Sequence, residues 1–226
     1  MEGLSWIARM STDSFDVVSV EIQKEGELVQ KELMIKDFAA ILNAAVVSES
    51  QLRLGKMPRG YYNASIDPNR TDTFQCVVVV PAGKRLIQYF DTIYEIPYPA
   101  SVFHFSSVEG CLKRSRVYFV NTDEPDDSTT LYQYCFGNVA SDTGEICWGQ
   151  NLLPELDGLK SCDQLVALFF GSPCNDDYYS YSRFHAGAPE YCKVQRALYE
   201  HLSGCDKFPF EILANTSRRM VDLLVM

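Results

Sequence analysis

The sequence predicts an α+β protein in which one helix precedes an antiparallel meander of four strands, with further helices after it. Two observations support this. Apolar and polar residues alternate through several short segments between residues 15 and 120, and helical spacing replaces the alternation near residue 37 and again after residue 160. The chain has 226 residues, 46% of them hydrophobic, so it can bury an ordinary core. We expect an N-terminal β-hairpin and a C-terminal helical extension around this domain.

The N-terminal elements follow from local patterns. Alternation on both sides of Glu25-Gly26 predicts a β-hairpin from about Phe15 to Ile35. The period then changes, and Asp37 is placed to cap a helix that runs to about Val47. The stretch Met57–Asp72 is dense in Pro, Gly, Asn and Asp, which predicts a loop.

The meander is predicted from three segments. Phe74–Phe90 holds two apolar-polar runs around the turn Pro81–Gly83 and predicts a hairpin. Ser101–Phe105 and Ser115–Val120 predict the third and fourth strands. "IPYPASVF" must approach the third strand in extended form, because residues before proline avoid helical angles.

A long connection and several helices follow. Asn121–Lys160 is rich in aromatic residues, and loops of this length in compact domains are commonly functional. Ser161 and Gln164 stand at capping-box spacing and predict the start of a helix. Further helices are predicted over Glu190–Leu202 and, shorter, within Phe210–Met226.

Charge and hydropathy restrict the partners. The net charge of -10 disfavours nonspecific binding to nucleic acid or anionic lipid. The first twenty residues lack an apolar segment behind a basic start, and no run of roughly 18 apolar residues suits a membrane helix. We expect a cytoplasmic protein with no direct nucleic-acid or membrane contact.

The chain has eight cysteines, which we expect to be reduced because there is no secretion signal. No pair shows CxxC spacing, so no metal site is predicted, and most are expected to be small buried hydrophobes. Cys147 differs, because it lies among turn formers in "FGNVASDTGEICWGQNLLP". Such an irregular polar loop must lie near the surface, so this thiol should be reachable.

The order of these segments resembles the ubiquitin-conjugating (UBC-like) fold, in which a flap carries His-Pro-Asn before a Gly-x-Ile-Cys nucleophile motif. Here "FGNV" stands where His-Pro-Asn-Val would stand and "GEIC", Gly144 to Cys147, stands at the nucleophile. Phe136 and Gly137 replace the His and Pro, and the interval from Asn138 to the cysteine is slightly longer than usual.

A bacterial branch, the PRTRC system protein B family or prokaryotic ubiquitin-conjugating-like family D, is more similar still. The stretches of this chain that correspond to that family's segments are "VVVVPAGKRLIQYF", "PYPASVFHF", "LYQYCFGNVASDTGEICWG" and "LVALFFGSP". The resemblance extends over about Phe15 to Asp177. The resemblance implies a hairpin extension at residues 1–35, a UBC-like catalytic domain at 36–178 and a helical extension at 179–226.

The resemblance implies that Cys147 accepts a ubiquitin-like protein as a thioester from a ThiF-like activating enzyme and transfers it to an amine. Sulfur suits this role because a thiolate attacks well and also leaves well. Asn138 would stabilise the oxyanion with its side-chain N–H, or be an ordinary turn asparagine. Gly144 would supply a positive backbone angle near the nucleophile.

The supporting candidates have equally plain alternatives. Asp142 and Glu145 would orient the amine or simply be solvated, and Trp148 would shield the thioester or simply pack. The resemblance also implies a JAB-family metallopeptidase in the same operon, and no metal or organic cofactor for this chain.

Two rival functions remain open. Loss of the His-Pro pair favours a catalytically silent protein that only binds a ubiquitin-like modifier or scaffolds its partners. A cysteine hydrolase would require His104, His185 or His201 within hydrogen-bond reach of Cys147. We expect His104, in an apolar strand, to be a core histidine with satisfied hydrogen bonds.

Overall fold

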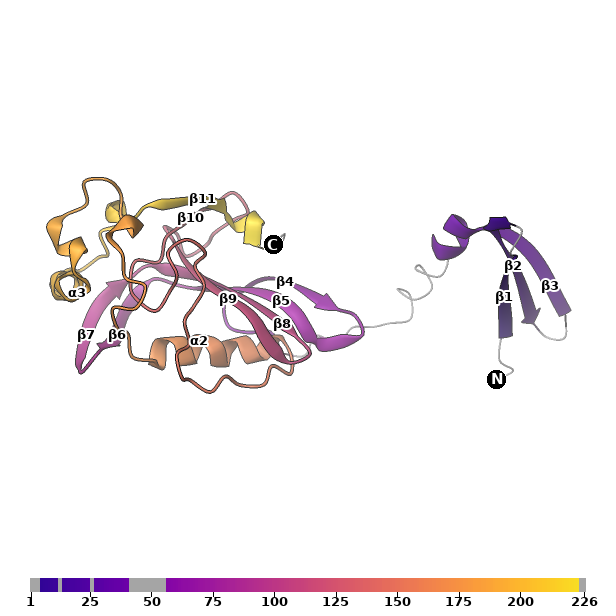
Figure 1. Ribbon diagram of the computed structural model, residues 1–226, viewed down its shortest axis with the longest axis horizontal. Coiled ribbons are helices and arrows are strands. Elements are labelled where there is room, and N and C mark those ends of the chain that lie inside the picture. Colours follow the sequence, from indigo (N-terminus) through magenta and orange to yellow (C-terminus); the bar gives the residue numbers. More distant parts are fainter. Residues whose placement is uncertain (1–4, 12–13, 25–26, 41–55, 224–226) are drawn as a thin grey trace. The chain divides into compact units, whose positions relative to one another are not determined.

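The computed structural model describes residues 5–11, 14–24, 27–40 and 56–223 (Figure 1). The chain divides into two compact units, Met1–Arg53 and Leu54–Met226. The division into residues 1–35, 36–178 and 179–226 stays a prediction. Among the described residues, no helix is both long and apolar enough to span a membrane.

The N-terminal unit contains a three-stranded antiparallel sheet with β2 at its centre. Its strands are β1 (Ser5–Ser11), β2 (Ser14–Lys24) and β3 (Glu27–Met34), so the predicted hairpin is confirmed and β1 is added to it. Val18 and Val20 of β2 are buried. Residues 35–40 are helical, and the rest of the helix predicted over Asp37–Val47 falls on residues 41–55, outside the described residues.

The C-terminal unit is built on a six-stranded antiparallel sheet in the order β11-β10-β9-β8-β5-β4. The strands are β4 (Tyr61–Asp67), β5 (Arg70–Val80), β8 (Ala100–Val108), β9 (Cys111–Val120), β10 (Thr130–Tyr132) and β11 (Asn215–Arg219). The strands predicted at Ser101–Phe105 and Ser115–Val120 are confirmed within β8 and β9. Together with the helices, the sheet gives the α+β class that the sequence predicts.

One predicted hairpin and one predicted loop are wrong. The hairpin predicted over Phe74–Phe90 does not form, because β5 pairs with β4 and β8 while β6 (Gly83–Tyr89) pairs with β7 (Thr92–Tyr98). The N–H of Ala82 donates to Asp123 Oδ1 at 2.7 Å, so the Pro-Ala-Gly link is held by a later loop. The loop predicted over Met57–Asp72 contains β4, a polar edge strand that includes Asn63 next to a register shift, and the start of β5.

The helices differ in detail from the predictions. Helix α2 (Cys162–Gly171) is confirmed, but Ser161 Oγ donates to Asp157 Oδ1 at 2.5 Å and does not cap the helix. The helix predicted over Glu190–Leu202 is split by the extended Val194 into a 3₁₀ helix, η3 (Glu190–Lys193), and α3 (Gln195–Ser203). The short helix predicted in the tail is instead β11, flanked by η4 (Phe210–Ile212) and η5 (Met220–Leu223).

Both faces of the large sheet are buried. One face carries Phe103, Phe105 and Phe119, which belong to the same apolar cluster as Leu165 of α2; α2 lies along this face in Figure 1. On the opposite face, Val102 of β8 and residues of β5 and β9 pack against Met220 and Leu223 near the C-terminus. The first cluster also contains the side chains of Phe136, Val139 and Ile146. The loop that carries the candidate site is therefore anchored in the core.

Candidate active site

The candidate site is carried by the flap, which we define as residues 136–147. Val139 pairs with Ile146 in an antiparallel bridge, and the N–H of Ala140 donates to the carbonyl of Glu145 at 2.8 Å. Beyond this pair, the N–H of Cys147 donates to the carbonyl of Asn138 at 2.8 Å. The flap therefore folds back on itself and brings Asn138 and Cys147 side by side.

Strand β9 holds the other end of the flap. The N–H of Ile146 donates to the carbonyl of Ser115 at 2.9 Å, and that of Val117 donates to the carbonyl of Gly144 at 3.0 Å. Gly144 has the positive backbone angle expected of it (φ 74°), and a Cβ there would lie 2.8 Å from the Tyr118 ring. Gly144 thus permits both the turn and its close packing on β9.

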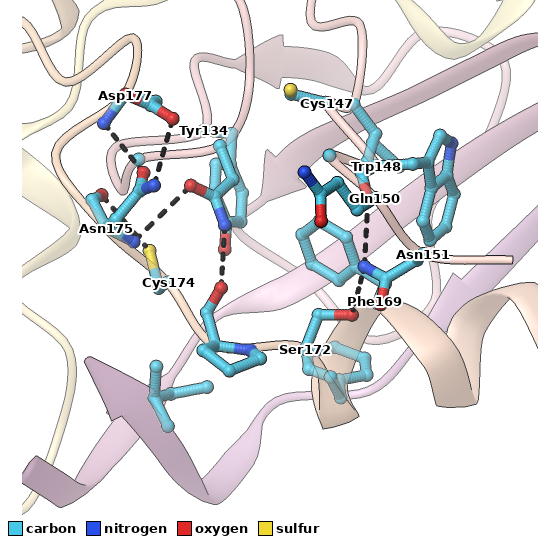
Figure 2. A pocket seen from close by; sticks show the side chains of 17 residues that line it. Tyr134, Cys147, Trp148, Gln150, Asn151, Phe169, Ser172, Cys174, Asn175 and Asp177 are labelled. Carbon is cyan, nitrogen blue, oxygen red and sulfur yellow. Dashed lines mark hydrogen bonds between the residues drawn. The ribbon is translucent and has the colours of Figure 1, made fainter. Parts of the chain in front are cut away.

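Cys147 is exposed at a pocket of about 210 Å³ (Figure 2). The pocket walls come from the flap, from residues 148–151, from the end of α2 and from residues 172–177, which we call the crossing segment. Ile87, Phe169 and Trp148 supply apolar surface, and a second thiol, that of Cys174, is buried in the wall. Burial raises the pKa of Cys174. Cys147 is therefore the thiol of this pocket that an incoming group can reach.

The crossing segment engages Asn138 through several contacts. The Nδ2 group of Asn138 donates to the carbonyl of Pro173 at 2.9 Å, and its backbone N–H donates to the carbonyl of Asp177 at 2.7 Å. Its Oδ1 accepts from the N–H of Asn175 at 3.4 Å. In this structure the Asn138 carboxamide therefore braces the crossing segment and leaves the sulfur of Cys147 without an amide donor from this side chain.

Packing explains why Phe and Gly stand where the UBC-like pattern has His and Pro. Phe136 is fully buried and stacks on Tyr199, with ring centroids 5.0 Å apart and planes 8° from parallel. A Cβ on Gly137 would lie 2.0 Å from the carbonyl oxygen of Asn175. The crossing segment passes so close to the flap that no side chain fits at residue 137.

The supporting candidates lie in different surroundings. Trp148 lines the pocket, donates from Nε1 to Ser115 Oγ at 2.9 Å and packs edge-on against Phe169. Glu145 is held on β9, where Arg116 lies 2.9 Å from its Oε1. Asp142 is exposed and lines a separate polar hollow that Gly144 also lines. The structure thus brings Cys147, Asn138 and Trp148 to one pocket, and places Asp142, Gly144 and Glu145 outside it.

Three carboxamides in this pocket were missed by the sequence reasoning. Asn151 Nδ2 donates to the carbonyl of Trp148 and to Ser172 Oγ, and Asn175 Nδ2 donates to Asp177 Oδ2. The Gln150 side chain makes no hydrogen bond with the described residues. Figure 2 shows its carboxamide extending into the pocket. Its position in the turn directly after the nucleophile was the available sequence signal.

The histidines lie elsewhere. None of the three lines the pocket of Cys147, so the arrangement that a cysteine hydrolase would require is not formed. His104 is buried in β8, and its two ring nitrogens have no partner among the described residues, so the prediction of a satisfied core histidine is wrong. Burial, with the nearby charges of Arg116 and Arg114, lowers the pKa of His104 to about 4.

Comparison with known families agrees with this geometry. The model of prokaryotic E2 family D matches residues 67–216. This range includes the flap, the pocket and the large sheet apart from most of its two edge strands, β4 and β11. Searches of curated proteins and of solved structures found no match. The family match covers well over half of the chain. The chain therefore belongs to prokaryotic E2 family D.

Proposed function

We propose that this protein is a ubiquitin-conjugating-like acyl transferase with Cys147 as its nucleophile. The observation that carries the proposal is the exposed thiol of Cys147 at the mouth of a pocket, held beside Asn138 by a main-chain hydrogen bond of 2.8 Å. Membership of an E2 family supports the same class of reaction.

Two exchanges make up the proposed reaction. The Cys147 thiolate attacks the carbonyl carbon of the C-terminal glycine of a ubiquitin-like protein, which arrives as a thioester on a ThiF-like activating enzyme, and the thiol of that enzyme leaves. An amine then attacks the new thioester, the Cys147 thiolate leaves, and the amine loses a proton to solvent. Each step exchanges one acyl bond for another and needs no cofactor.

The negative charge that develops on the acyl oxygen needs a hydrogen-bond donor, and loss of one such donor costs on the order of 3 kcal/mol. We propose Asn138 for this role, reached by releasing the carbonyl of Pro173, which its Nδ2 group binds at 2.9 Å. Gln150 is a second candidate, because its carboxamide reaches the pocket without a partner among the described residues. Asp142 and Glu145 have no proposed role at the thioester, since they lie outside this pocket.

The apolar wall has a proposed role of its own. Trp148 is fixed by its hydrogen bond to Ser115 and by its contact with Phe169, so it forms a rigid side of the pocket. An aromatic wall beside the sulfur would exclude water, which otherwise hydrolyses a thioester. We propose this shielding role for Trp148.

The partners belong to the same proposal. They are a ubiquitin-like protein, a ThiF-like activating enzyme and a JAB-family metallopeptidase encoded with them, in a cytoplasmic system of the PRTRC type. A second candidate function is a silent E2-like protein that binds the modifier without chemistry, and the engagement of the Asn138 amide by Pro173 favours it.

One experiment separates the two candidates. The protein is incubated with its ubiquitin-like protein, activating enzyme and ATP, and the products are separated with and without a reducing thiol. We expect a thiol-sensitive adduct that Cys147→Ala abolishes and that Cys111→Ala, at the other exposed cysteine, leaves intact. Binding of the modifier with no adduct would establish the silent protein.

A further inference from the structure

Arg183 lies at the end of the 3₁₀ helix η2 (Tyr181–Arg183), and its side chain is fully buried. Nη1 donates to the carbonyls of Tyr134 at 2.8 Å and Phe136 at 2.5 Å, and Nη2 donates to the carbonyls of Val139 and Tyr178. No carboxylate forms an ion pair with Arg183 in the part of the chain that the structure describes.

A buried charge without a counterion is rare, because the loss of hydration must be offset by other polar contacts. A guanidinium stays charged in proteins, even though burial lowers the pKa of Arg183. Here four backbone carbonyls accept hydrogen bonds from the two Nη groups, while Nε has no partner among the described residues. A single side chain therefore binds the carbonyls of four separate peptide groups.

The location of these carbonyls gives Arg183 a specific effect. Those of Phe136 and Val139 flank Asn138 on either side. Val139 pairs with Ile146, the residue before Cys147. The main chain of Arg183 is itself fixed, because its carbonyl accepts from the N–H of Ala214 at 3.0 Å. A residue from beyond the crossing segment thus contacts the backbone next to both candidate catalytic residues.

We propose that Arg183 is the positioning residue of the flap, holding Asn138 and Cys147 in register by fixing the carbonyls on both sides of Asn138. The inference rests on the proposed function only in taking these two residues as the reacting ones. It assigns a role at the active site to residue 183, in the region that the sequence predicts to be a helical extension.

The first test compares Arg183→Lys with the natural protein by amide hydrogen exchange in the full chain. Lysine keeps the charge but lacks the planar fork, so it cannot bind carbonyls in several directions at once. The amides of Ala140, Gly144 and Cys147, all hydrogen-bonded within the flap, should exchange about tenfold faster, as expected for loss of one or two hydrogen bonds. Amides of β8 and β9 away from the flap should keep their protection.

A matched control separates positioning from general loss of stability. Val102→Ala truncates a fully buried side chain in the cluster on the opposite face of the sheet, which contains no flap residue. It should speed exchange across the sheet and flap alike. If Arg183→Lys produces the same uniform pattern, Arg183 has no positioning role. Unchanged flap exchange would mean that lysine replaces the arginine contacts, and Arg183→Ala then decides.

A second variant keeps the test decisive if lysine is accommodated. Arg183→Ala leaves a cavity of guanidinium shape, so guanidinium ion at concentrations far below those that denature should restore flap protection and the natural rate of Cys147 alkylation by iodoacetamide. Sodium ion at equal ionic strength should restore neither. Restoration by both salts, or by neither, would overturn the proposal.

The transfer reaction supplies a readout that depends on the proposed function. If the thioester forms, Arg183→Lys should slow its discharge to hydroxylamine by about a hundredfold, the loss expected for misplacement of about 1 Å. The amount of modifier needed for half-maximal loading should change little. If the natural protein forms no thioester, the proposed function fails, while hydrogen exchange and alkylation still decide the role of Arg183.

Discussion

The backbone N–H of Cys147 donates to the carbonyl of Asn138 over 2.8 Å, while the side-chain amide of Asn138 is turned to the carbonyl of Pro173 at 2.9 Å. A main-chain contact therefore sets how close the two residues lie, and a side-chain contact sets where the amide points. Substitution of Asn138 removes the second contact and leaves the first in place, so the two contributions can be measured separately.

Asn138→Ala and Asn138→Gly both remove the carboxamide, but only alanine must place a Cβ at φ 61°. A left-handed backbone costs a residue that has a Cβ about 1–2 kcal/mol. In urea titrations we therefore expect the free energy of unfolding of Asn138→Ala to be lower than that of Asn138→Gly by that amount. If the amide acts on the oxyanion, both variants should discharge the thioester about a hundredfold more slowly. Full activity of Asn138→Gly would remove Asn138 from the mechanism.

Gln150 and Asn151 are neighbouring residues whose carboxamides line the same pocket. Among the described residues, the Asn151 side chain forms hydrogen bonds and the Gln150 side chain forms none. Gln150→Ala should change the free energy of unfolding by less than about 0.5 kcal/mol, because its exposed side chain has no partner among the described residues. Asn151→Ala should cost about 1–2 kcal/mol, because it loses bonds to Trp148 and Ser172.

Single-turnover discharge of the thioester then assigns the donor. A rate reduced by about a hundredfold in Gln150→Ala, with stability retained, would identify Gln150 as an oxyanion donor. If the rate falls only in Asn151→Ala, the shape of the turn after Cys147 matters and Gln150 has no catalytic role.

Gly137 tests how closely the crossing segment approaches the flap. A Cβ in Gly137→Ala would lie 2.0 Å from the carbonyl of Asn175, so the segment must move and the bonds to Asn138 must break. We expect a loss of about 3 kcal/mol or more in thermal or urea unfolding. Gly149→Ala is the matched control, because a Cβ added at Gly149 would have no atom within 4 Å. Its positive φ of 57° alone should lower the free energy of unfolding by about 1 kcal/mol. Equal losses in the two variants would show that the contact is relaxed in solution.

His104 predicts a pH dependence of stability. Its folded pKa of about 4 lies below the unfolded value near 6.5, so between these pH values the unfolded state binds a proton that the folded state does not. The free energy of unfolding should therefore decrease as the pH falls from 6.5 towards 4, by roughly 3 kcal/mol in all.

Urea unfolding at a series of pH values checks this dependence. His104→Leu should remove that part of the slope, while substitution of the exposed His201, which stacks on Tyr191, should retain it. A slope that is the same in natural protein and His104→Leu would assign the acid sensitivity to other groups.

Local sequence patterns determined several parts of this protein. Alternation located β2, β3, β8 and β9, helical spacing located α2, and the density of turn formers around Cys147 predicted a thiol at the surface, where the structure has it. These features depend on residues that are neighbours in the chain, so their signal lies within short windows of sequence.

Only the tertiary structure decided which strands pair and where the site side chains point. The link at Ala82 is held by Asp123 and does not close a hairpin, the Asn138 amide is bound by the crossing segment, and Arg183 reaches the flap from a distant helix. Each of these contacts joins segments far apart in the chain through backbone groups that every residue type possesses. No residue pattern near Asn138 or Cys147 encodes them, because the free energy that selects them comes from hydrogen bonds formed only after the chain has folded.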